Sequence, residues 1–84
     1  MYVASLPDLK YEIYAVGKTK EECEKNLIAG FQQYLKSYHT TFEELLEDLT
    51  ENYADYDNDM WTFIHDYYGA RMFNVDKGYA IEWE

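Results

Sequence analysis

Cysteine and proline are nearly absent from this chain, which has one of each among its 84 residues. Because Cys23 has no second cysteine to pair with, an internal disulfide is excluded and a reducing compartment is the simplest setting. No apolar run approaches the length of a membrane span, and the first residues, which include Asp8 and Glu12, lack the pattern of a signal peptide. We therefore expect a cytoplasmic protein that has no membrane partner.

Lysine and arginine are absent from the centre of the chain. The 34 residues between Lys36 and Arg71 contain no basic side chain except histidine and carry −9 of the formal net charge of −10. The carboxylates of this stretch are Glu43, Glu44, Glu47, Asp48, Glu51, Asp55, Asp57, Asp59 and Asp66. Such a surface repels phosphate, so we expect no direct binding to nucleic acid or anionic lipid. A basic protein would be attracted to it instead.

Aromatic residues, by contrast, are plentiful: the chain has four Phe, two Trp and ten Tyr. Hydrophobic residues make up 48% of the sequence, which is too many for a disordered acidic segment. Large rings bury much apolar area per residue and allow a chain of this size to build a dense core. Residues 1–84 are therefore expected to form a single domain.

Strand signals lie at the two ends of the chain, where apolar and polar residues alternate and turn residues intervene. The predicted strands are 2–6, 10–16, 71–75 and 79–83. Pro7 and Asp8 supply the first turn, and Gly78 suits the left-handed position of a turn in the terminal hairpin.

Three helices are predicted between these strands. Thr19 and Thr41 each stand three residues before a glutamate, as at the start of a capping box. The third helix is expected to start at Asp57 or Asn58 and to end before Gly69. The apolar stripes at helical spacing are Cys23, Leu27, Phe31, Tyr34, Leu35 and Tyr38, then Phe42, Leu45, Leu46, Leu49 and Tyr53, then Met60, Trp61, Ile64, Tyr67 and Tyr68.

The order β-β-α-α-α-β-β predicts an α+β fold, in which a small antiparallel sheet from both chain ends has three helices packed on one face. Gly30 lies inside the first helix, where glycine costs about 1 kcal/mol relative to alanine. Its presence predicts a close approach to another backbone.

The acidic second helix and the residues after it are the candidate binding surface. The predicted partner-binding residues are Glu43, Glu44, Glu47, Asp48, Glu51, Asp55, Tyr56, Asp57 and Asp59. Between Glu43 and Asp55 a helix rises about 18 Å, a length along which B-DNA carries roughly ten phosphates. The carboxylates approach that density without matching it. The alternative is a solvated acidic face that needs no partner.

No pattern in the sequence predicts an enzyme, a metal site or a cofactor. Asp55, Asp57 and Asp59 alternate as at the start of a calcium loop, but Met60 stands where that loop needs glycine. Cys23 lies on an apolar helical stripe and is interpreted as a buried structural cysteine. The glycines are scattered and form no phosphate-binding loop.

The first part of the chain carries two short motifs, Leu6-Pro7-Asp8-Leu9 and Gly17-Lys18-Thr19-Lys20-Glu21-Glu22. They resemble the strand-ending Pro-Asp pair and the G-x-T-x-E-E helix start of HicB-like antitoxin N-terminal domains, and the resemblance covers residues 2–35. The glycine that usually follows Pro-Asp in that family is missing here, and no DNA-binding C-terminal module is visible. The resemblance implies a small sheet-plus-helix module that neutralises a partner protein.

In size, acidity and aromatic content, the chain is also similar to small phage anti-defence proteins, such as anti-CRISPR and anti-restriction proteins. The leading hypothesis is therefore a non-enzymatic inhibitor that blocks a basic, nucleic-acid-binding host protein, by DNA mimicry or a related mode, in a bacterial or phage-infected cell. The second hypothesis is a HicB-like antitoxin domain that neutralises a small RNA-cleaving toxin through its sheet or a strand edge. A third is an acidic structural module without an inhibitory role.

Overall fold

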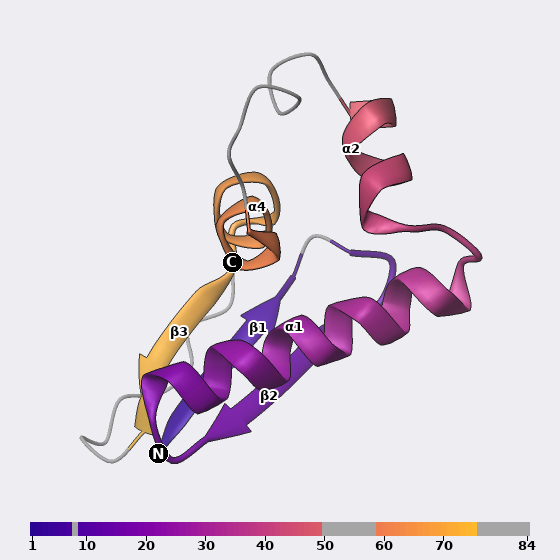
Figure 1. Cartoon of the computed structure of the whole chain (residues 1–84). Coiled ribbons are helices and arrows are strands. Elements are labelled where there is room, and N and C mark those ends of the chain that lie inside the picture. Colours follow the sequence, from indigo (N-terminus) through magenta and orange to yellow (C-terminus); the bar gives the residue numbers. More distant parts are fainter. Residues whose placement is uncertain (8, 50–58, 76–84) are drawn as a thin grey trace.

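The computed structural model describes residues 1–7, 9–49 and 59–75. Within them β1 (Tyr2–Leu6) is the central strand of a three-stranded sheet of order β2-β1-β3. It pairs antiparallel with β2 (Ile13–Gly17) and with β3 (Arg71–Asn74), so strands from before and after the helices share one sheet (Figure 1). The predicted α+β fold with its antiparallel sheet is confirmed. The predicted turn at Gly78 and the strand 79–83 lie outside the described residues.

The second strand begins at Ile13, three residues later than predicted. Leu6 is the last residue of β1 and pairs with Ile13, and Pro7 follows it with no amide hydrogen to donate. Residues 10–12 therefore have no strand to pair with. Tyr11 instead leaves the sheet and places its ring 5.0 Å from that of Tyr34 on the neighbouring helix.

Helix α1 (Lys20–Ser37) crosses one face of the sheet (Figure 1). Alternation places Ala4, Leu6, Ile13 and Ala15 on the covered face, and all four are buried. The helix buries Cys23, Leu27, Phe31 and Leu35 against them, which confirms the inner part of the predicted stripe. Fully burying a leucine, isoleucine or phenylalanine contributes about 1.5–3 kcal/mol, so the larger side chains of this layer contribute substantially to stability.

Both ends of α1 are capped by hydrogen bonds between residues that are close in the sequence. The Glu22 amide donates to the Thr19 hydroxyl oxygen at 3.1 Å, as predicted, while the Glu22 carboxylate accepts from the amide of Lys18 at 3.3 Å. At the other end His39 adopts a left-handed φ of 55°. The amides of His39 and Thr40 donate to the carbonyls of Lys36 and Leu35, which together make a Schellman motif.

Helix α4 (Met60–Tyr68) begins after Asp59 and ends at Gly69, whose φ of 64° confirms the predicted left-handed stop. Its buried side differs from the predicted stripe. Phe63, outside that stripe, is fully buried together with Ile64, and Tyr67, inside it, is 40% exposed. The reason is that Phe63 packs edge-on against Phe42 of α2 (Phe42–Leu49), with ring centroids 5.1 Å apart.

Gly30 is required by a side chain of the sheet rather than by another backbone, which corrects the sequence-based expectation. A Cβ atom at this position would lie 2.8 Å from Cγ2 of Ile13. The close backbone approach occurs at Gly17 instead, where a Cβ atom would lie 2.4 Å from the Cys23 amide nitrogen. Gly17 therefore sets the tight connection between β2 and α1.

The Gly30→Ala variant is expected to be less stable than the wild type, although helix propensity alone predicts a gain of about 1 kcal/mol. Cγ2 is a branch of a buried β-branched residue with few alternative rotamers, so overpacking should cost about 1–3 kcal/mol. Urea unfolding measures the difference. In an Ile13→Ala background, which lacks Cγ2, the same change should stabilise the protein. A higher melting temperature for Gly30→Ala alone would contradict the packing.

Candidate functional site

Helix α2 carries the part of the acidic surface that the structure describes. Its start is defined by Thr41, whose hydroxyl oxygen accepts from the Glu44 amide at 3.1 Å. The Thr40 hydroxyl donates to the Glu44 carboxylate at 3.3 Å and holds that side chain over the first turn. The predicted helix start at Thr41 is confirmed. Carboxylates are favoured at this end of a helix by its dipole.

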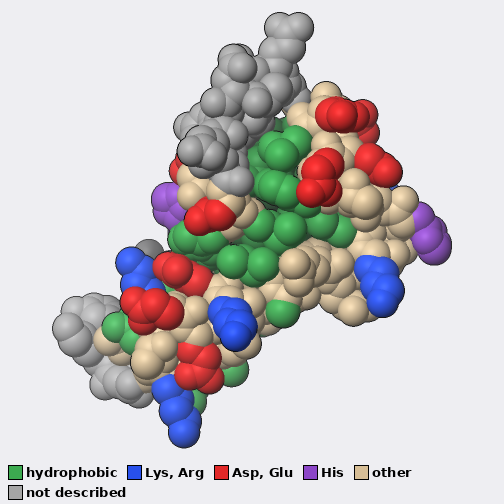
Figure 2. Space-filling view, in the orientation of Figure 1, with side chains coloured by type: hydrophobic (Ala, Val, Ile, Leu, Met, Phe, Trp, Pro, Cys, Tyr) green, Lys and Arg blue, Asp and Glu red, His purple; other side chains and the backbone are tan. Residues whose placement is uncertain are grey.

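The two sides of α2 differ sharply in chemistry. Glu43, Glu44, Glu47 and Asp48 are all exposed. On the other side Phe42, Leu45, Leu46 and Leu49 pack against the core but stay only half-buried, and no residue of α2 is fully buried. Figure 2 shows carboxylates gathered beside a continuous hydrophobic area on this face of the molecule.

No basic side chain within α2 offsets the negative charge of its carboxylates. Glu43 and Glu47, like Glu44 and Asp48, are four residues apart, which makes them neighbours of equal charge on the helix surface. The last turn of α2 contains no basic residue. Each such pair weakens the helix by a few tenths of a kcal/mol, so the arrangement lowers stability while it strengthens the local negative potential.

Four of the predicted binding residues lie outside the described part of the chain. They are Glu51, Asp55, Tyr56 and Asp57. The comparison with DNA can therefore be made only along α2, whose eight residues rise about 12 Å and correspond to roughly seven phosphates of B-DNA. Its four carboxylates amount to about half that charge density.

Asp59, the remaining predicted binding residue, caps α4. Its carboxylate accepts a 2.8 Å hydrogen bond from the amide of Thr62. That bond stabilises the ionised form and lowers the pKa of Asp59 below its ordinary value. The Asp59 side chain therefore stabilises the N-terminus of α4.

Asp59→Ala is expected to lower the free energy of unfolding by about 1 kcal/mol at neutral pH, the usual cost of losing a helix cap. Because the folded-state pKa of Asp59 is depressed, its contribution is present above the unfolded value of 3.8 and is lost as the pH falls through the folded pKa. Urea unfolding at several pH values should show the two proteins converging in acid. Asp48→Ala, at an exposed position without a capping bond, is the control, and an equal loss there would contradict the assignment.

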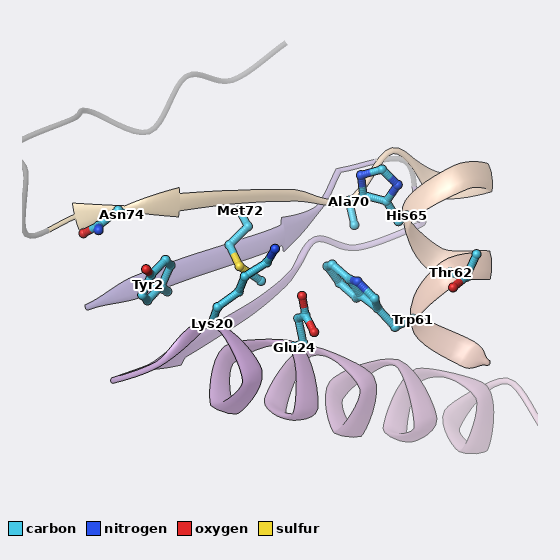
Figure 3. A pocket seen from close by; sticks show the side chains of 9 residues that line it. All are labelled: Tyr2, Lys20, Glu24, Trp61, Thr62, His65, Ala70, Met72 and Asn74. Carbon is cyan, nitrogen blue, oxygen red and sulfur yellow. The ribbon is translucent and has the colours of Figure 1, made fainter. Parts of the chain in front are cut away.

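A groove that the sequence does not reveal lies between the start of α1, α4 and the sheet (Figure 3). Its volume is about 560 Å³. The lining residues are Tyr2, Lys20, Glu24, Trp61, Thr62, His65, Ala70, Met72 and Asn74. They come from three separate parts of the chain, which are β1, the start of α1 and the segment 61–74 that contains α4 and β3. The only local signals are therefore the i, i+4 spacings of Lys20 with Glu24 and of Trp61 with His65.

Cys23 does not line this groove and supplies no reactive group to it. Cys23 is buried, as predicted, and its thiol contacts the Ala15 carbonyl oxygen at 3.6 Å. Burial raises the pKa of Cys23, so its reactive thiolate is disfavoured. Within residues 1–7, 9–49 and 59–75, no three His, Cys, Asp or Glu side chains come together in a way that could hold a metal ion.

Comparison with protein-family models, with curated proteins and with solved structures finds no match. The resemblances to HicB-like antitoxins and to anti-defence proteins therefore stay predictions. Among the described helices, none is long and apolar enough to cross a membrane.

Proposed function

We propose that this protein is a non-enzymatic inhibitor that binds a basic, nucleic-acid-binding host protein through the face carrying α2. The observation that supports this most is the exposure of all four α2 carboxylates beside leucines that are only half-buried. Protein interfaces combine an apolar centre with a polar rim, and this face has both parts. A solvated face needs the acids but not the adjoining apolar area.

The two parts of the surface would act at different stages of binding. The carboxylates of α2 attract a basic partner from a distance and raise the association rate. Leu45, Leu46 and Leu49 then lose their remaining contact with water, which slows dissociation. A lysine- and arginine-lined groove that normally holds nucleic acid suits both stages, and its occupation would exclude the nucleic acid.

The experiment is a competition assay on a partner captured from the native host. The partner is bound to labelled DNA or RNA, and the purified protein should displace the nucleic acid at stoichiometric concentration. The protein alone should give no gel shift at about 0.1 M salt, because carboxylate and phosphate repel. A partner that keeps its nucleic acid when saturated with this protein would refute the inhibitory role. Tight nucleic-acid binding by the protein itself would refute the charge argument.

A HicB-like antitoxin domain is the second candidate, and one observation favours it. In the sheet of described strands, β2 lies at an edge, and its Tyr14 and Val16 are 52% and 54% exposed. An edge strand can pair with a strand of another protein. The readout is protection of RNA from a small toxin ribonuclease, and loss of that protection in Val16→Pro, which removes an edge amide, would favour this candidate.

A further inference from the structure

The groove beside Trp61 contains a carboxylate that has no partner in the described part of the chain. Glu24 projects from α1, is half-buried, and forms no hydrogen bond or ion pair with any residue in 1–7, 9–49 or 59–75. Lys20 lies one turn earlier and is exposed, yet it makes no ion pair with Glu24. The Glu24 carboxylate is therefore available to accept charge-assisted hydrogen bonds from a cationic ligand in the groove.

The walls around Glu24 suit a flat, delocalised cation. Trp61 reaches from α4 toward Glu24, and Tyr2 and Met72 line the side of the groove formed by the sheet (Figure 3). The Trp61 ring lies 6.0 Å from the ring of His65, which supports the indole from its own helix. Tryptophan is the aromatic side chain that attracts cations most strongly, and a guanidinium can stack on it while it donates two hydrogen bonds to a carboxylate.

We propose that this groove binds a guanidinium group, that of an arginine side chain on the basic partner. The guanidinium would stack on Trp61 and donate to Glu24. The identity of the partner rests on the proposed function, but the groove can be tested without it. Anionic ligands would have to approach Glu24 and a chain of net charge −10, which disfavours them.

The test uses N-acetyl-arginine amide as the probe and the indole N–H signal of Trp61 in a nitrogen–proton correlation spectrum as the readout. Trp61→Phe assigns the signal, because the chain has a second tryptophan. The arginine probe should shift the signal saturably in the millimolar range. N-acetyl-citrulline amide, which has nearly the same shape without the charge, should not. Equal shifts with citrulline, or no saturable shift with arginine, would overturn the proposal.

Matched variants locate the site. Glu24→Gln should weaken binding of the arginine probe about tenfold, as expected for the loss of a charge-assisted pair. Glu21→Gln removes the same charge at an exposed position of α1 that does not line the groove and should change little. Lys20→Gln should strengthen binding about twofold or more by removing a competing cation, whereas Lys25→Gln should not. Unchanged binding in Glu24→Gln, or preferential binding of N-acetyl-aspartate amide, would refute the assignment.

The outcome separates this proposal from the proposed function. If the groove does not bind guanidinium but neutralising α2 slows partner association, the groove assignment falls and the inhibitory role stands. If the groove binds guanidinium and the partner binds equally well to Glu24→Gln, the arginine does not come from that partner. The groove then binds an arginine of some other molecule, and the proposed link to the basic partner is overturned.

Discussion

Neutralising three carboxylates of α2 is expected to slow association with the basic partner about tenfold or more while the dissociation rate changes little. The variant is Glu43→Gln, Glu47→Gln and Asp48→Asn combined, and all three side chains are exposed. Glu44 is kept because its carboxylate accepts a hydrogen bond from Thr40. Since the changes remove like-charge neighbours, the fold should be retained and slightly stabilised.

A second variant, which removes three acids elsewhere, distinguishes the effect of where the charges lie from the effect of net charge on the association rate. Glu12→Gln, Glu21→Gln and Asp66→Asn make the same change in net charge at exposed positions outside α2. Association rates at two salt concentrations, measured by surface plasmon resonance, should fall much further for the α2 variant and lose most of their salt dependence. If both variants slow association equally, overall charge is responsible. If the α2 variant associates at the wild-type rate, α2 is a solvated face.

Phe31→Ala is expected to be the most damaging single substitution in the described core, with a loss of about 3–5 kcal/mol in the free energy of unfolding. Phe31 is fully buried, and its ring lies 5.7 Å from Tyr68 of α4 and 6.2 Å from Tyr34. Tyr68 shares this environment, and burial raises its pKa to about 12. A small domain has only about 5–15 kcal/mol of stability, so the variant should be close to unfolded at 37 °C.

Leu46→Ala is the matched comparison, and the structure changes what is expected of it. The sequence places Leu46 on the buried stripe of the second helix, where full burial would give a loss of about 2–5 kcal/mol. In the structure Leu46 is only half-buried, so a loss of about 1 kcal/mol is expected. Urea unfolding measures both variants, and Phe31→Leu extends the series if Phe31→Ala does not fold. A larger loss for Leu46 than for Phe31 would place the core elsewhere.

Local chemistry made much of this fold predictable. Thr19 and Thr41 cap helices because a hydroxyl three residues before an amide can satisfy it without help from the rest of the chain. The left-handed Gly69 follows from the same kind of short-range geometry. The alternation in β2 and the stripe of α1 depend only on the periods of strands and helices, so both were visible in the sequence.

The candidate site was predictable only where it depends on charge. The exposure of the α2 carboxylates follows from the cost of desolvating them, which holds in any fold. The groove was not predictable, because Tyr2, Lys20, Glu24 and Trp61 become neighbours only when β1, α1 and α4 pack together. The second role of Asp59, as a helix cap, became evident only once the start of α4 was located at Met60.

By itself the sequence determined the types of element, the helix boundaries at Thr19, Thr41 and Gly69, the inner stripe of α1 and the acidic character of the central surface, because these depend on neighbours a few residues away. The tertiary structure decided which contacts join distant segments. It placed Ile13 against Gly30, and this contact decides whether Gly30→Ala raises or lowers the free energy of unfolding. It also buried Phe63 against Phe42. It also left Glu24 facing Trp61 without an ionic partner among the described residues. Such contacts follow from how elements pack in space, and no local period in the sequence encodes them.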